Sequence, residues 1–92
     1  MITSHSGRAA LRAQIIKMFG DVYRSQKEGE SAPEITDDAV MLESGLDSLG
    51  FAILVTRLEE ELGYDPFSLS PEAYYPRTFG EFVAFYYRYK PE

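Results

Sequence analysis

The chain has 92 residues, a formal net charge of −6 and no cysteine. This length predicts one domain with a single small core, and the lack of cysteine excludes disulfides, thiolate metal sites and a cysteine nucleophile. No apolar run is long enough to span a bilayer and the N-terminus lacks the apolar region of a signal peptide, so we expect a cytoplasmic protein without membrane insertion.

Charge is unevenly distributed along the chain. Residues 1–27 carry five basic side chains against one acid, whereas residues 28–72 carry twelve acids against Arg57 alone. The acidic middle argues against nucleic acid as a partner and favours a protein with a basic face. Ordinary solubilising charge explains the same pattern equally well.

The first predicted element is a helix over residues 7–25, with Ser6 as its N-cap. Its apolar residues recur at helical spacing and predict a surface that faces the core. These residues are Leu11, Ile15, Met18, Phe19 and Val22. We expect residues 1–6 to form a flexible terminus, which disfavours a catalytic role for the lone His5.

Residues 26–46 predict a long connection rich in turn-forming residues. Ile35 and the Val40-Met41-Leu42 cluster are expected to anchor this segment to the core. Gly45 is expected to adopt a backbone angle that other residues resist.

Residues 48–62 form the most regular amphipathic segment and predict the second helix. Asp47 is a suitable N-cap, and Ser48 then lies at the positive end of the helix dipole, where a phosphate would be stabilised. At about 100° per residue, one face is apolar and predicted to be core. This face consists of Phe51, Leu54, Val55, Leu58 and Leu62.

The opposite side of this helix carries Leu49, Ile53, Thr56 and Glu60, with Arg57 beside them. Two exposed aliphatic side chains on one helix face are compatible with a partner interface. Single exposed apolar residues are also common in proteins that bind nothing there.

The remaining residues predict two further helices. Ser70-Pro71-Glu72 predicts a short third helix over about residues 71–75, ended by Pro76. Thr78 and Glu81 have capping-box spacing and begin a last helix that runs to about Tyr89, with a ring-rich face. With no strand pattern, the sequence predicts an all-α fold of three longer helices and one short third helix, its helical core spanning about residues 7–89.

The residues offer little catalytic machinery. No cluster of histidine, cysteine and acidic residues has metal-ligand spacing. Leu46 stands where a nucleophile elbow around Ser48 would require glycine. We therefore expect no metal site and a chain without catalytic activity.

Residues 42–49, Leu-Glu-Ser-Gly-Leu-Asp-Ser-Leu, resemble the phosphopantetheine attachment motif of the acyl carrier and peptidyl carrier protein superfamily, whose core is Asp-Ser-Leu. Residues 58–63 resemble the end of that family's second helix, and residues 75–82 resemble its lead into the last helix. The resemblance implies an acyl-carrier-protein-like four-helix bundle and a single carrier domain over residues 1–92.

The resemblance also implies a function. Ser48 would accept 4′-phosphopantetheine from coenzyme A through a magnesium-dependent phosphopantetheinyl transferase, and Asp47 would cap the helix and help to dock that enzyme. The arm would carry an acyl or aminoacyl group as a thioester between acyl- or aminoacyl-activating and acyl-transferring enzymes. The family's partner-recognition surface matches Leu49, Ile53, Thr56, Arg57 and Glu60. We expect the carrier to be a monomer.

Two positions depart from the housekeeping fatty-acid carriers, which resemble one another in having an acid where Ile53 stands and an apolar residue where Thr56 stands. This favours a specialised, free-standing carrier in a fatty-acid-, polyketide-, peptide- or glycolipid-type pathway, and leaves a fatty acyl, hydroxyacyl or aminoacyl cargo open. The alternative hypothesis is an unmodified helical adaptor that binds a protein through Leu49 and Ile53. A serine hydrolase is disfavoured.

Overall fold

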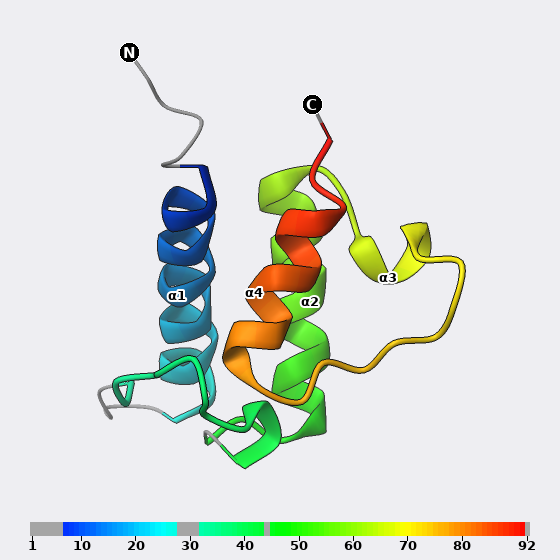
Figure 1. Ribbon diagram of the computed structural model, residues 1–92. Coiled ribbons are helices and arrows are strands. Elements are labelled where there is room, and N and C mark those ends of the chain that lie inside the picture. Colours follow the sequence, from blue (N-terminus) through cyan, green and yellow to red (C-terminus); the bar gives the residue numbers. More distant parts are fainter. Residues whose placement is uncertain (1–6, 28–31, 44, 92) are drawn as a thin grey trace.

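The computed structural model describes residues 7–27, 32–43 and 45–91. Within these ranges the chain forms the helices α1 (Gly7–Gln26), α2 (Ser48–Leu62), α3 (Pro66–Leu69) and α4 (Phe79–Arg88), and the 3₁₀ helix η2 (Met41–Glu43) (Figure 1). The predicted all-α class, with three longer helices and one short one, is confirmed. The predictions for Ser6 as a cap, for His5 and for a flexible terminus lie outside the described residues.

The three longer helices lie side by side, with α1 antiparallel to both α2 and α4 and the short α3 to one side of them (Figure 1). Their inward faces form one apolar core. Its most buried members are Ile15, Phe19, Val22, Met41, Leu46, Leu54, Leu58, Phe79, Phe82, Val83 and Tyr86. None of the described helices is long and apolar enough to cross a membrane.

α2 begins and ends where the sequence predicts. Leu54 and Leu58 are fully buried, and Phe51, Val55 and Leu62 are partly buried against the same core. Gly63 ends the helix in a left-handed conformation, with φ +85°, and its amide donates to the Glu59 carbonyl. A C-terminal glycine is favoured there because it has no Cβ to resist positive φ.

The predicted position of the short helix is wrong. It forms at Pro66–Leu69, where the Asp65 carboxylate accepts hydrogen bonds from the Phe67 amide at 3.0 Å and the Ser68 hydroxyl at 3.0 Å. The Ser70 hydroxyl instead donates to the Glu72 carbonyl at 2.8 Å, within a bend. Residues 70–78 therefore lack helix and return along the molecule to α4 (Figure 1).

The long connection before α2 is attached to the core, as expected, but through fewer anchors. Ile35 and Met41 are buried, whereas Leu42 is 58% exposed, so its expected role as an anchor is wrong. The reason is the 3₁₀ turn, which buries Met41 and thereby directs the next side chain outward. Backbone pairing adds to this attachment, since the Met41 amide donates to the Arg77 carbonyl at 2.9 Å.

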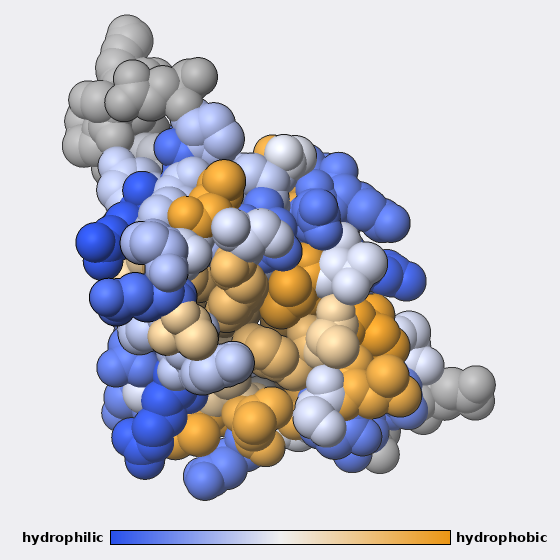
Figure 2. All heavy atoms as spheres, turned by 90° about the vertical axis from the view of Figure 1, so that its right-hand side faces the viewer, coloured by the Kyte–Doolittle hydropathy of each residue, from blue (hydrophilic) through white to orange (hydrophobic). Residues whose placement is uncertain are grey.

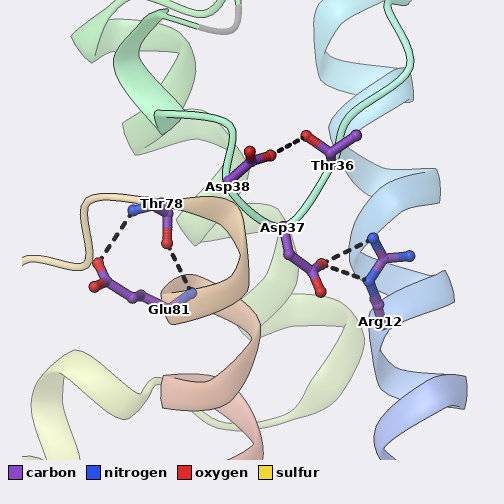
Figure 3. Close-up of polar contacts among 6 residues, drawn as sticks. All are labelled: Arg12, Thr36, Asp37, Asp38, Thr78 and Glu81. Carbon is purple, nitrogen blue, oxygen red and sulfur yellow. Dashed lines mark hydrogen bonds and ion pairs between the residues drawn. The ribbon is translucent and has the colours of Figure 1, made fainter.

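A polar contact joins the same connection to α1, and a capping box begins α4 (Figure 3). The Arg12 guanidinium donates to Asp37 Oδ1 at 2.9 and 3.0 Å, and it also lies over the Phe79 ring, 5.4 Å from its centroid. At the start of α4, the Thr78 hydroxyl accepts from the Glu81 amide at 3.2 Å and Glu81 Oε1 accepts from the Thr78 amide at 3.2 Å. The predicted capping box is thus confirmed, and the helix ends at Arg88, one residue earlier than expected.

Candidate functional site

Ser48 is the first residue of α2, and its side chain is exposed. The Asp47 carboxylate accepts a hydrogen bond from the Gly50 amide at 2.8 Å, which confirms Asp47 as the N-cap. No hydrogen bond to another described residue occupies the Ser48 hydroxyl. This hydroxyl is therefore accessible and lies beside the free amides of a helix N-terminus, which favour a negatively charged group.

Two glycines lie where the end of α1 approaches the segment that carries Ser48. Gly45 has φ +105°, which confirms the prediction that it adopts a backbone angle other residues resist. A Cβ there would lie 2.5 Å from Tyr23 Cε2. A Cβ at Gly50 would collide with Gln26 Oε1. Gln26 Oε1 is the far end of a flexible side chain and can move aside, so the demand for glycine is weaker at position 50 than at position 45.

The predicted recognition surface is largely accessible. Leu49 is 63% exposed, and Thr56, Arg57 and Glu60 are also exposed and lie together along a shallow hollow of α2.

The expectation that Ile53 is equally exposed is wrong. Its side chain is partly buried and packs against the core. It lines the shallow hollow that Thr56, Arg57 and Glu60 share, and also a second hollow that extends to residues 25–27. Periodicity places Ile53 on the outer side of α2, but it does not reveal that the side chain packs against the core.

An apolar groove of about 320 Å³ lies on the other side of Ser48. It is lined by residues 40–42, Ser48, Phe51, Phe67 and residues 75–77. Figure 2 views the molecule from the side of α3 and the 70–78 connection, and apolar side chains gather over the middle of this face. The sequence did not predict this groove. Its only local signals are the apolar cluster at 40–42 and the ring of Tyr75, which come from separate segments.

The arrangement has the features of an acceptor site. In the described part of the chain, no group of three or more histidine, cysteine or acidic residues could hold a metal ion. What the site offers is an accessible hydroxyl at a helix start, an exposed helix surface on one side and an apolar groove on the other.

Comparison with known proteins agrees with this geometry. A family model described as "Phosphopantetheine attachment site" matches residues 25–84, about two thirds of the chain. No curated protein and no solved structure was found to match. The matched range contains Asp47, Ser48 and all of α2.

Domains of this family are the attachment site of a covalently bound 4′-phosphopantetheine group and are generally non-catalytic. The resemblance noted in residues 42–49 is thus confirmed by a match that extends well beyond that motif. The chain belongs to the phosphopantetheine attachment site family, within the acyl and peptidyl carrier protein superfamily.

Proposed function

We propose that Ser48 is the attachment residue and that the chain carries an acyl or aminoacyl group between partner enzymes. The observation that carries this proposal is the free, exposed hydroxyl of Ser48 at the start of α2, within the matched range. Other described serines of that range have engaged hydroxyls. Ser25 donates to Val22, Ser68 to Asp65 and Ser70 to Glu72.

The residues around Ser48 fit the prosthetic group. The N-terminus of α2 offers backbone amides to a phosphodiester, and Asp47 holds the first turn in place through its bond to Gly50. When bound, 4′-phosphopantetheine supplies the thiol that this cysteine-free chain lacks, on which cargo is held as a thioester. The chain's own residues present the arm and partner surface and carry out no chemical step.

A direct experiment tests the attachment residue. The protein is incubated with coenzyme A, magnesium and a broad-specificity phosphopantetheinyl transferase, and its intact mass is then measured. We expect a gain of one phosphopantetheine in the wild type and in Ser68→Ala, and no gain in Ser48→Ala. An unmodified wild type, or a gain that persists in Ser48→Ala, would refute the proposal and favour the adaptor that binds through Leu49 and Ile53.

We further propose that Leu49, Ile53, Thr56, Arg57 and Glu60 form the surface that the transferase and the acyl-handling enzymes contact. Leu49 is the most exposed apolar residue of this surface, and exposed apolar anchors contribute strongly to interfaces. Leu49→Ala should slow loading of Ser48 by roughly tenfold without lowering the free energy of unfolding.

Leu69→Ala is the matched control, because Leu69 is 52% exposed and lies on α3. Its loading rate should equal that of the wild type. Equal slowing in both variants would mean that Leu49 has no special part in recognition.

A further inference from the structure

The groove beside Ser48 is open to a ligand tethered to that residue, because Ser48 lies on its edge. Two of its lining side chains are strongly exposed, Leu42 at 58% and Tyr75 at 83%. An apolar group seated in the groove would remove this surface from water, which is favourable. The groove thus offers an apolar group a binding surface that the fold itself leaves uncovered.

The space behind the groove is filled by aromatic rings. Phe51 meets Phe82 edge-on, with 5.6 Å between the ring centroids, and Phe67 meets Phe85 in the same way at 5.0 Å. Phe82 also contacts Tyr86 at 4.8 Å, and both are fully buried. A long chain could pass between α2 and α4 only by displacing close-packed rings. The groove therefore suits a ligand that ends within it.

We propose that this groove binds the acyl group carried on Ser48 and favours a compact aromatic acyl group over a long aliphatic chain. The inference rests on the proposed attachment at Ser48. An apolar cavity of roughly 150 Å³ holds a benzene molecule, so about 320 Å³ accommodates one ring and the atoms that link it to the arm. Phe51, Phe67 and Tyr75 supply rings for edge and offset contacts that an alkyl chain cannot make.

Tethering makes weak contacts sufficient. A ligand joined to the protein by a flexible linker experiences an effective concentration on the order of millimolar. An aryl group on the arm then occupies the groove for much of the time even if its free form binds poorly. In the docked state the acyl group is shielded from solvent, and its thioester should react more slowly with an added nucleophile.

The test uses protein loaded at Ser48 from acetyl-, phenylacetyl- or hexadecanoyl-coenzyme A, with loading verified by intact mass. Cleavage by hydroxylamine is timed for each, and its half-life is divided by that of the same thioester on free pantetheine. We expect this ratio to be at least about three times as large for the phenylacetyl form as for the acetyl and hexadecanoyl forms. The phenylacetyl form should also melt at a higher temperature, because the docked group stabilises the folded state.

A matched pair of variants locates the effect. Leu42→Asp places a charge in the groove, whereas Leu69→Asp changes a leucine of similar exposure that does not line it. The protection should disappear in the first variant and persist in the second. Protection of hexadecanoyl equal to phenylacetyl, or protection that survives Leu42→Asp, overturns the inference while leaving attachment intact. Failure to load Ser48 overturns both proposals.

Discussion

Gly45 and Gly63 both adopt left-handed backbone angles, but only Gly45 lies against another side chain. A Cβ at Gly45 would lie 2.5 Å from the Tyr23 ring, whereas nothing lies within 4 Å of a Cβ at Gly63. Gly63→Ala should therefore lower the free energy of unfolding by about 1–2 kcal/mol, the cost of positive φ for a residue with a Cβ. Gly45→Ala should lower it further, because the ring must also move.

Urea unfolding of the two variants measures this difference. Loading of Ser48 provides a second readout, since Gly45 lies three residues before it and Gly63 at the far end of α2. We expect slower loading only in Gly45→Ala. Equal losses of stability would show that the contact between Gly45 and Tyr23 has little energetic weight.

Tyr86 carries a buried hydroxyl with no hydrogen-bond partner among the described residues. Burial raises the pKa of this hydroxyl, so it stays neutral, and its desolvation is uncompensated. Tyr86→Phe removes the unpaired group and should raise the free energy of unfolding by about 1 kcal/mol.

Tyr64→Phe is the opposite case, because the Tyr64 hydroxyl donates to the Tyr86 carbonyl at 2.6 Å. This change should lower the free energy of unfolding by about 1 kcal/mol. Thermal and urea unfolding of both variants check the pair, and a loss in Tyr86→Phe would mean that its hydroxyl is satisfied in solution.

At the level of elements, the start of α4 depends on an ionised Glu81. Hydrogen bonds from the Arg77 amide and then the Thr78 amide hold the pKa of this carboxyl below its ordinary value of 4.5. The ionised form is thus favoured in the folded state, and its contribution to stability is present above about pH 4.5. That contribution is lost as the pH falls through the lower, folded pKa.

Glu81→Gln tests this linkage, because glutamine retains an acceptor oxygen but does not ionise. The wild type should be the more stable protein at neutral pH, and its advantage should shrink as the pH falls below 4.5 and through the lower, folded pKa of Glu81. Urea unfolding of both proteins across this range measures the difference. A constant advantage would show that the charge of Glu81 is irrelevant to the cap.

The elements also show where local sequence signals are sufficient. The cap at Asp47 and the box at Thr78 are short-range features, and α2 and α4 begin where they predict. The short helix was predicted from Ser70-Pro71 but begins after Asp65, which caps it. Burial favours this position, because Pro66 is buried in the core, whereas residues 71–75 are exposed.

At the level of the whole molecule, Arg12 joins three parts of the fold. It pairs with Asp37 of the connection and lies over Phe79 of α4, whereas Arg24 pairs only with Asp21 in its own helix. Arg12→Ala should lower the free energy of unfolding by about 1 kcal/mol, since an exposed pair and a cation–π contact are both lost. Arg24→Ala should cost roughly 0.3 kcal/mol.

Urea unfolding at low and high salt checks this comparison. High salt should reduce the ionic part of the Arg12 effect and leave the contact with the ring. If Arg12→Ala and Arg24→Ala cost the same, the connection is attached by its backbone pairing and buried anchors alone.

The sequence by itself determined the all-α class, three of the helices, the caps of α2 and α4 and the place of Ser48 beside Asp47. These features depend on the periodicity of apolar residues and on contacts within a few residues, both of which can be read along the chain. Only the tertiary structure decided that Ile53 is partly buried against the core and that Leu42 is exposed. It also created the groove beside Ser48, because residues 40–42, Phe51, Phe67 and 75–77 meet only when α2, α3 and the two connections pack together.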